Sequence, residues 1–421
     1  MNYCKHLSYK SIMEKQDQRA YDLLAERLAK KGISIENIKK RLKEQVIELP
    51  SWAVGNSGTR YGTFRNPGAA ITIWDKIDDC AEIQRRVGIC PKMASHVLWD
   101  VTEDGKFTPV KEYAENLGMS IGTVHPNTFM GQQFRLGSIC NPFEEVRQST
   151  IEHFRECVRI TREMGSKYIG IWLADGTNYP GQDNLCERKH RLEEGLQSLY
   201  KAMDPDMTLL VEYKPFEPAF YTTDLMDWGM SYLVCKKLGE RAKVLVDLGH
   251  HLPGVNIEQI IAILLDENKL GGFHLNNRKY ADDDLMVGSI NPFELYLIYC
   301  QLVESLEDGQ GDKTCYMLDQ SHNIEPSIEG IIQSVMNAQT AFAKALILEQ
   351  KTLKIFQQEG DVMMANRTIM EAYEADVQPL IKEVRSEMGL EPDPLIAYRQ
   401  GGYAKKIAQK RKDQGKNTLG G

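Results

Sequence analysis

Apolar positions follow two different patterns along the chain. The first fifty residues are charged, with apolar positions at helical spacing, which predicts helices over 16–31 and 35–48 with Ser34 as N-cap and Pro50 as the stop. From residue 51, short apolar runs alternate with longer amphipathic stretches. Eight such runs occur: SWAVGN from Ser51, MASHVLW from Met93, MSIGTVH from Met119, KYIGIWLAD from Lys167, MTLLVEYK from Met207, AKVLVDLGHH from Ala242, LGGFHLNN from Leu270 and TCYMLD from Thr314.

This alternation predicts a parallel β-sheet covered by helices, because near-continuous apolar strands are typical of sheets buried on both faces. Eight strand–helix units favour a closed (β/α)8 TIM barrel, an α/β fold, over an open doubly wound sheet. No GxGxxG follows the first run and no GxxxxGK[ST] occurs, which weakens a nucleotide-binding alternative. We expect an N-terminal helical segment over 1–50, the barrel with its site over 51–335, and a C-terminal helical extension over 336–421.

The C-terminal extension has a helical pattern of its own. Residues 331–358 predict one long helix, and residues 368–389 predict another that is interrupted near Pro379. The tail from Gly401 carries six basic residues and one acidic residue. Because it has no aromatic residue for base stacking apart from Tyr403, we interpret it as a solvated tail or a subunit-contact arm.

Composition narrows the class of protein. The chain has 421 residues, 51 Lys+Arg against 59 Asp+Glu, and a net charge of −8, which disfavours nucleic acid as a partner. Its nine scattered cysteines include no CxxC pair, which is typical of reduced thiols in a cytoplasmic protein. The N-terminus lacks the apolar region of a signal peptide, and no apolar stretch is long enough to span a membrane.

Residue types that bind metals stand at the ends of four successive apolar runs. The fifth to eighth runs end in, or are closely followed by, Glu212, Asp247 with His250, His274 with the acidic loop Asp282-Asp283-Asp284, and Asp319. Active sites of TIM barrels lie at the C-terminal ends of the strands. One such residue alone is more often a helix cap or a packed core residue. Four at equivalent positions on neighbouring strands predict one shared pocket.

A pocket with five carboxylates and two imidazoles needs counter-charge. Without it the carboxylates would repel one another and raise each other's pKa. Ligands of this kind with no thiolate suit Mn²⁺, Mg²⁺ or Co²⁺ better than a structural zinc site. Seven ligands exceed what one octahedral ion accepts alongside a substrate, so the sequence predicts two divalent ions that share a bridging carboxylate.

Other catalytic motifs are weak or missing. The sequence contains neither a GxSxG nucleophile elbow nor an HExxH zinc-binding helix. His322 follows the last run without an obvious second ligand beyond Asp319, so we interpret it as structural or supporting. His125 ends the third run, and lining the pocket and packing in the core are equally compatible with its position.

The order of these ligands resembles the two-metal site of xylose-isomerase-like sugar isomerases over about residues 50–330. Asp at 247 and His at 274, in place of the usual Glu and Asp, are similar to the bacterial L-rhamnose isomerase branch, as are His96-x-x-Trp99 and Trp172. The matching pattern is Glu212-x-Lys214-Pro215-x-Glu217, Asp247-x-x-His250, His274, Asp282-x-Asp284 and Asp319.

The resemblance implies a ligand set for each ion. Glu212, Asp247, His274 and Asp319 would hold the structural ion, and Asp247, His250, Asp282 and Asp284 the catalytic one, with Asp247 as the bridge. It implies Mn²⁺ as the first expectation, with Co²⁺, Mg²⁺ or Zn²⁺ as substitutes, and a homotetramer.

The resemblance also implies a reaction, the interconversion of L-rhamnose and L-rhamnulose by hydrogen transfer between C1 and C2. Lys214 would stabilise charge on the sugar oxygens, although its alternative is a salt bridge to Glu217. Asp284 would take part in the transfer, by a hydride or an enediol route, and His96 would help open the sugar ring. Trp52, Trp99 and Trp172 would form an apolar wall, although each could equally belong to the core.

Three alternatives remain open at this point. The nearest is a related isomerase or 3-epimerase acting on D-allose, L-lyxose or D-psicose. The Asp282-x-Asp284 pair argues against an epimerase, which would normally need only one metal ion. A phosphodiesterase of the barrel endonuclease type would need a basic groove for DNA, which the net charge of −8 does not provide. The last is a sugar-binding or assembly protein with a decayed site.

Overall fold

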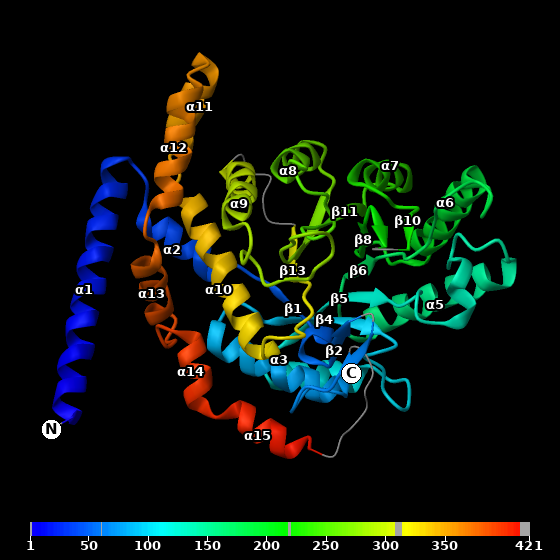
Figure 1. The fold of residues 1–421 in the computed structure, drawn as a ribbon, viewed down its shortest axis with the longest axis horizontal. Coiled ribbons are helices and arrows are strands. Elements are labelled where there is room, and N and C mark those ends of the chain that lie inside the picture. Colours follow the sequence, from blue (N-terminus) through cyan, green and yellow to red (C-terminus); the bar gives the residue numbers. More distant parts are fainter. Residues whose placement is uncertain (1, 60, 218–219, 308–313, 413–421) are drawn as a thin grey trace.

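A closed barrel of eight parallel strands forms the centre of the molecule, which confirms the predicted fold class (Figure 1). The computed structural model describes residues 2–59, 61–217, 220–307 and 314–412. The strands lie in the order β1-β13-β12-β11-β8-β6-β5-β4. Their bounds are β1 Glu48–Pro50, β4 Lys92–Val97, β5 Ser120–Pro126, β6 Tyr168–Ile171, β8 Thr208–Glu212, β11 Ala242–Asp247, β12 Leu270–Leu275 and β13 Cys315–Leu318.

Helices follow the strands and cover the outside of the barrel, as the amphipathic stretches predict (Figure 1). They are α3 Ile73–Val87, α4 Thr108–Asn116, α5 Glu144–Glu163, α6 Leu185–Ala202, α7 Trp228–Leu238, α8 Ile257–Asp266, α9 Pro292–Glu307 and α10 Ser327–Leu346. Short elements occupy the loops: η1 Ser51–Val54, β2 Ser57–Thr59, β3 Gly62–Phe64, η2 Gln132–Leu136, β7 Gly176–Thr177, β9 Phe216–Glu217 and β10 Tyr221–Thr223.

The prediction of the first strand at SWAVGN was wrong. The strand is Glu48–Pro50, and Ser51–Val54 forms the 3-10 helix η1. Pro50 has no N–H for a sheet hydrogen bond, so the strand ends there. The buried Ser51 then turns the chain, with its hydroxyl donating to Asp100 after β4.

Close packing inside the barrel requires glycine at one position near the site. A Cβ atom on Gly170 of β6 would lie 2.3 Å from Cε1 of His125, which is nearer than real contacts allow. Gly170 therefore leaves room for the imidazole of His125, which is buried at the end of β5.

Two helices precede the barrel. Helix α1 spans Asn2–Lys30, and α2 spans Ile35–Glu44, where the Ser34 side chain accepts a hydrogen bond from the backbone N–H of Asn37, as predicted. Helix α2 ends four residues earlier than the prediction because Glu48 already belongs to the first strand.

The C-terminal part is helical, as expected, but the prediction of a single long helix over 331–358 was wrong. Helix α10 ends at Leu346, and α11 spans Gln350–Glu359. Residues 345–348 are all buried, whereas a continuous surface helix would turn some of them to solvent. The remaining helices are α12 Val362–Glu374, α13 Gln378–Glu387, α14 Pro394–Gly401 and α15 Tyr403–Lys410, so the predicted interruption near Pro379 is confirmed. The predicted boundary at residue 335 falls inside α10.

The basic tail is only partly described, and its first part is not a freely solvated segment. Arg411 is buried, with its guanidinium 3.1 Å from Asp75 and 2.7 Å from Asp79 of α3. Tyr403 also donates to Asp79. These contacts fix α15 to the barrel, whereas residues 413–421 lie outside the described residues.

The sequence also predicts reduced cysteines and no membrane-spanning segment. The eight cysteines with described side chains are all free thiols. Within the described ranges, no helix combines the length and the apolar character needed to cross a membrane.

Candidate metal centre

Four of the predicted ligands converge at the C-terminal end of the barrel. One ligand atom from each of Glu212, Asp247, His274 and Asp319 lies within 4.8 Å of the others. His274 Nδ1 is central to the group, at 3.1 Å from Glu212 Oε1, 3.2 Å from Asp319 Oδ2 and 3.6 Å from Asp247 Oδ2. The first three residues are buried and Asp319 is partly exposed.

Strand order explains this convergence. Strands β8, β11, β12 and β13 are consecutive neighbours in the barrel. Glu212 and Asp247 are the last residues of their strands, and Asp247 pairs in register with His274 of β12. Asp319 directly follows β13, and its N–H donates to the carbonyl of Leu275. The ligand atoms are therefore held by the sheet itself.

The electrostatics of the four residues show how strongly they interact. Although burial alone would lower the pKa of His274, the carboxylates of Glu212, Asp247 and Asp319 raise it well above its usual value. Burial raises the pKa of Glu212. Burial disfavours the charged form of Asp247 as well, but His250 and His274 outweigh it and lower the pKa of that carboxyl. Positive charge is therefore required among these groups.

The residues predicted for the second ion are near the first group but come partly from a loop. His250 Nε2 lies 3.0 Å from Asp282 Oδ1, and His250 Nδ1 lies 3.2 Å from Glu212 Oε1. The pKa of His250 is raised to about 9, because Asp247, Asp282 and Glu212 outweigh the effect of burial. Burial and the carboxylates of Asp282, Asp319 and Asp247 raise the pKa of Asp284.

The loop that carries Asp282 and Asp284 follows β12 and is held in shape by its own hydrogen bonds. Asp282 and Asp284 both have positive φ, at 53° and 48°, which is uncommon for residues other than glycine. The intervening Asp283 accepts hydrogen bonds from the N–H groups of Lys279 and Tyr280 at 2.5 and 2.6 Å. The N–H of Asp282 donates to the carbonyl of Gly249. The loop thereby turns Asp282 toward His250.

Lys214 is buried between two carboxylates beside this group. Its Nζ lies 2.5 Å from Asp282 Oδ2 and 2.8 Å from Glu217 Oε2. Although burial would lower the pKa of Lys214, these two carboxylates raise it, so the ammonium is charged at neutral pH. The salt bridge to Glu217 that the sequence left as an alternative is therefore formed together with a contact to the acidic loop. The ammonium also lies 4.9 Å from the ring centre of Trp172.

Comparison with known proteins identifies the family. The profile of the family described as xylose isomerase-like TIM barrel matches residues 92–312. The chain is 40% identical over 399 residues to a "probable sugar isomerase" of Rhizobium meliloti, an alignment that covers 93% of this chain and 92% of that protein. It belongs to the xylose isomerase-like TIM-barrel family of sugar isomerases.

Proteins with lower sequence identity to this chain support only weaker conclusions about its function. An L-rhamnose isomerase of Listeria monocytogenes is 25% identical over 379 residues, which cover 83% of this chain and 87% of that enzyme. A solved structure titled L-ribulose 3-epimerase superposes with a TM-score of 0.52 and 11% identity, covering 74% of this chain and 97% of that chain. That structural likeness supports the shared barrel fold and nothing finer.

The donor set of this sugar-isomerase-family protein fits a divalent ion. Three carboxylates and one imidazole without a thiolate are typical of Mn²⁺, Mg²⁺, Co²⁺ or zinc sites in enzymes. The imidazole nitrogen of His274 faces three carboxylate oxygens, so a shared cation can replace the proton that otherwise balances their charge. A second acidic group, Cys140, Asp175 and Asp224, is already occupied by protein donors, because Ser138, Cys140 and Arg188 donate to its carboxylates.

Aromatic side chains form one side of the centre. The rings of Trp52, Trp99 and Phe129 lie 5.8, 4.3 and 5.6 Å from the ring of His96, in each case measured between ring centres. Trp172 lies 4.8 Å from Phe129. All three predicted tryptophans therefore belong to one aromatic group with His96, and Phe129 is a member that sequence reasoning missed. Trp52 also donates from Nε1 to Asp319 Oδ1 at 2.8 Å, which links this group to the carboxylates.

The two histidines in the aromatic group are neutral. Burial lowers the pKa of His96 to about 3 and that of His125 well below its usual value. Among the described residues, His96 Nδ1 and His125 Nε2 are buried without a hydrogen-bond partner, and the His125 ring lies 5.5 Å from His274. His125, which the sequence left undecided, therefore stands beside the carboxylate group. His322 lies against Gly330 of α10 instead.

Two supporting contacts were also missed. Asn276 donates from Nδ2 to both oxygens of Asp247, at 3.0 and 3.1 Å. Its position two residues after His274 puts it on the same face of the strand, which is a pattern the sequence offers. Buried Asp100 accepts from the backbone N–H of His96 and pairs with Lys76 of α3 at 2.7 Å, an arrangement that no local sequence pattern indicates.

Proposed function

We propose that this sugar-isomerase-family protein is an aldose–ketose isomerase that interconverts L-rhamnose and L-rhamnulose. The observation that carries the proposal is the group of Glu212, Asp247, His274 and Asp319 at consecutive strand ends, with the charged Lys214 beside it. The similarity to an L-rhamnose isomerase at 25% identity supports this choice of sugar.

Transfer of hydrogen between C1 and C2 of an open-chain sugar builds negative charge on O1 and O2. When bound, divalent ions supply Lewis-acid stabilisation for that charge. Lys214 adds a fixed ammonium, which Asp282 and Glu217 hold in place so that little reorganisation is needed during the reaction. Mn²⁺ is the ion we propose first, with Co²⁺, Mg²⁺ or Zn²⁺ as substitutes.

The second ligand set of the proposal is Asp247, His250, Asp282 and Asp284. Asp247 influences both groups, since it contributes to the raised pKa of His250 and of Asp284. A carboxyl whose pKa is raised by three other carboxylates needs either a proton or a nearby cation. Asp284 is therefore suited to bind an ion or to exchange a proton with the substrate.

The aromatic group would receive the carbon face of the sugar and exclude water from C1 and C2. His96 is neutral, and its Nδ1 has no hydrogen-bond partner in the part of the chain that the structure describes, so it can form a hydrogen bond with a sugar oxygen without adding charge. This role suits assistance in ring opening. Trp52, Trp99 and Trp172 would set the shape of the wall.

A related isomerase or 3-epimerase acting on another sugar is the second candidate. The relative at 40% identity is named only as a "probable sugar isomerase", with no sugar in its name. D-allose, L-lyxose and D-psicose are the alternatives to test, because one small apolar contact to a methyl group discriminates by only about 1–3 kcal/mol.

The experiment is a sugar panel followed by proton NMR, which detects both isomerisation and epimerisation. Wild-type protein is treated with EDTA, reloaded with Mn²⁺, and given L-rhamnose, L-lyxose, D-allose or D-psicose. We expect turnover only with metal, and the highest kcat/KM for L-rhamnose. Another preferred sugar would overturn the substrate, and metal-independent turnover would overturn the metal site. Lys214→Met should lower kcat by about 100-fold, whereas the exposed control Lys237→Met should not.

We propose a cytoplasmic homotetramer with helices outside the barrel at the subunit contacts. Helices α11 and α12 project from the body of the molecule (Figure 1), and Val362 and Met363 at their tip are each 76% exposed. Light scattering after size-exclusion chromatography tests this, and a monomer at micromolar concentration would contradict it.

A further inference from the structure

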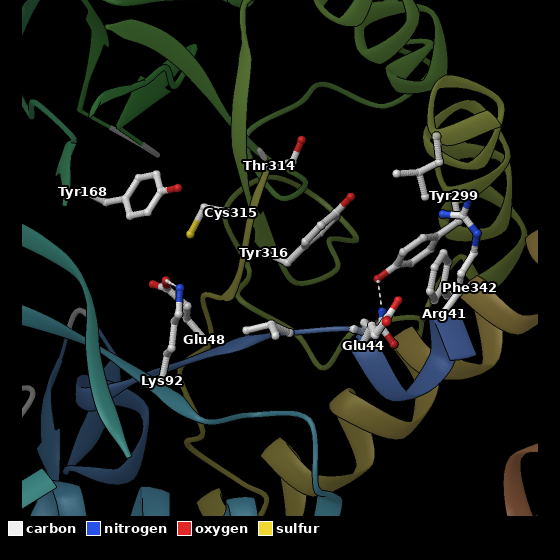
Figure 2. Close-up of a pocket in the computed structure, with 13 residues that line it drawn as sticks. Arg41, Glu44, Glu48, Lys92, Tyr168, Tyr299, Thr314, Cys315, Tyr316 and Phe342 are labelled. Carbon is white, nitrogen blue, oxygen red and sulfur yellow. Dashed lines mark hydrogen bonds and ion pairs between the residues drawn. The ribbon is translucent and has the colours of Figure 1, made fainter. Parts of the chain in front are cut away.

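Charged side chains are placed differently at the two ends of the barrel. At the N-terminal ends of the strands, a cavity is lined by Arg41, Glu44 and Lys92, which all keep contact with solvent (Figure 2). Near the C-terminal ends, Arg188 of α6 is only 2% exposed. Burial of a guanidinium is costly unless carboxylates pair with it. The partners of Arg188 therefore indicate what its burial secures.

Arg188 binds one carboxylate with two sides of its guanidinium. Its Nε lies 3.0 Å from Asp224 Oδ1, and its Nη2 lies 2.7 Å from Asp224 Oδ2. The remaining nitrogen, Nη1, donates to Asp183 Oδ2 at 3.1 Å. Paired contacts of this kind fix direction as well as distance. Arg188 therefore holds Asp224, which directly follows β10, against the first turn of α6.

Asp224 needs this partner because a second carboxylate lies beside it. One oxygen of Asp224 and one of Asp175 lie within 4.8 Å of each other. The N–H of Asp224 donates to the carbonyl of Asp175 at 2.8 Å, which keeps the two residues together. Asp175 is buried, and it accepts from the N–H groups of Ser138 and Cys140. Without Arg188 the two carboxylates would repel each other, and the segment that carries Asp224 would move.

The residues on either side of Asp224 hold the backbone of Lys214. The N–H of Lys214 donates to the carbonyl of Leu225 at 2.9 Å, and the hydroxyl of Thr223 donates to the carbonyl of Lys214. Strand β8 ends at Glu212, so Lys214 lies beyond the part of the chain that the barrel sheet positions. Residues 223–225 take over that role. The position of the Lys214 backbone thus depends on where Asp224 is held.

The same segment guides the side chain of Lys214. Strand β10, which ends one residue before Asp224, pairs with β9 and β7 in a small sheet. In that sheet Tyr221 lies opposite Glu217 of β9. Glu217 Oε2 lies 2.8 Å from Lys214 Nζ. The residues that orient the ammonium are therefore joined to the segment that Arg188 anchors.

We propose that Arg188 is a positioning residue for the isomerase reaction. By binding Asp224 it sets the backbone of residues 223–225, and through that segment the position of the Lys214 ammonium. Arg188 acts through Lys214 and does not contact the sugar. The inference rests on the proposed function, in which Lys214 stabilises charge on the sugar oxygens, but the position of Lys214 can be measured without any sugar.

Acetylation of lysines measures that position directly. Wild type and Arg188→Gln, both in Mn²⁺, are treated with an N-hydroxysuccinimide ester of acetic acid, and peptide mass spectrometry gives the rate at each lysine. Lys214 is 4% exposed, so its rate in the wild type should be low. We expect it to rise about fivefold in Arg188→Gln relative to the exposed Lys237, because local opening exposes the amine.

A buried lysine elsewhere reports on general loosening of the fold. Lys269 is buried and donates to the carbonyls of Cys235, Gly239 and Ala242. Its acetylation rate should not change in Arg188→Gln. An unchanged rate at Lys214, or a parallel increase at Lys269, would overturn the proposal.

Kinetics test whether the position of Lys214 matters for turnover. We expect Arg188→Gln to lower kcat by about tenfold and to change KM by less than about twofold, because the charge that Lys214 meets develops during the reaction. In a Lys214→Met background, Arg188→Gln should cause no further fall. A further fall of similar size there would show that Arg188 acts by another route. Full activity of Lys214→Met itself would refute the proposed role of Lys214, a different failure from unchanged acetylation.

Two more variants keep the test decisive if Arg188→Gln does not fold. Arg188→Lys keeps the positive charge but loses the paired contact with Asp224, so it should give smaller changes in the same direction. Thr223→Val keeps the shape of the side chain, removes the hydroxyl that binds Lys214, and should also speed acetylation of Lys214. Wild-type rates in both variants would contradict the proposal.

The matched control is Arg191→Gln. Arg191 lies on the same helix as Arg188 and binds Asp183 at 2.7 Å, so its removal disturbs the same group of charges without removing the guanidinium that holds Asp224. Both kcat and the acetylation rate of Lys214 should match those of the wild type. Changes as large as those in Arg188→Gln would show that the loss of any cation here is sufficient, and would overturn the assignment to Arg188.

Discussion

The four donors around His274 come from strand ends, whereas the donors assigned to the second ion depend on the loop after β12. In the first group every ligand atom lies within 4.8 Å of the others. In the second, His250 and Asp282 are in contact at 3.0 Å, and Asp284 is brought near by a loop in which Asp282 and Asp284 both have positive φ. The sheet therefore positions the first half of the proposed centre, and a loop positions part of the second.

This difference has a physical origin. Strand ends in a closed barrel are positioned by the hydrogen-bonded sheet, so their donors are in place before an ion binds. A loop loses conformational entropy when its carboxylates are gathered, and their mutual repulsion adds to that cost. We therefore expect the first site to bind its ion more tightly and the second to be the more easily emptied.

The largest effect is expected from Asp247→Ala, because Asp247 is the proposed bridge and contributes to the electrostatics of both groups. We predict loss of both ions and a fall in turnover of about 1,000-fold. Metal analysis of the purified variant, together with the sugar assay, measures this. Asp247→Asn keeps the side-chain shape, so the same losses in this variant would show that they do not come from misfolding. Asp206→Ala, at an exposed position, is the control. Two ions retained in Asp247→Ala would refute the bridge.

Asp284→Asn should affect the second ligand set of the proposed centre and leave the first intact. It removes a loop carboxylate but leaves the strand-end donors unchanged, so we predict one retained ion and a fall in turnover of about 100-fold. The raised pKa of Asp284 means that its charge is unfavourable in the metal-free protein, so in EDTA the variant should unfold at a higher temperature than the wild type. Asp266→Asn, at the end of α8, is the matched control. Full activity with one ion would show that the second set has no role.

The sequence predicted the strand-end half of the centre better than the loop half, for a physical reason. A run of apolar residues that ends in Glu212 or Asp247 predicts a strand. It also predicts the end of the barrel at which that last residue lies, because parallel strands share one direction. No such rule specifies how residues 277–285 fold, which depends on Asp283 accepting from backbone N–H groups within the loop. The contact of Lys214 with Asp282 was therefore missed, although that with Glu217 was considered.

The same reasoning explains the errors in the fold. Seven of the apolar runs coincide with strands, but SWAVGN is the segment after the first strand, which is only the three residues Glu48–Pro50. Three residues are too few to show a periodic pattern. The break between α10 and α11 has neither proline nor glycine, and it is set by burial of residues 345–348 against the core. Phe129 and Asp100 are placed by tertiary contacts, which the local pattern does not encode.

Metal affinity should depend on pH in both halves, since His250 and His274 each have a raised pKa, to about 9 for His250. Metal binding requires neutral imidazoles, so Mn²⁺ affinity should rise with pH, by about tenfold per unit for each proton released. The stability that the protonated histidines give the metal-free protein is present below about pH 6.5 and is lost as pH rises toward 9. Calorimetric titrations between pH 6 and 8.5 test this. His250→Gln should reduce the slope by about one proton, and a flat profile would contradict the raised pKa values.

The smallest effect is expected from Trp52→Phe, which tests how far the strand-end group relies on its surroundings. The indole N–H donates to Asp319 Oδ1 at 2.8 Å, and phenylalanine removes this hydrogen bond while retaining an aromatic ring. Since Asp319 is the partly exposed member of the group, it is the ligand that most needs an orienting partner. We predict Mn²⁺ binding weaker by about tenfold at the first site. In the control Trp99→Phe the lost donor faces Met130 Sδ instead, so affinity for the ion should be unchanged. Equal losses in the two variants would mean that the aromatic wall acts on the ion only through packing, and that the sheet alone orients Asp319.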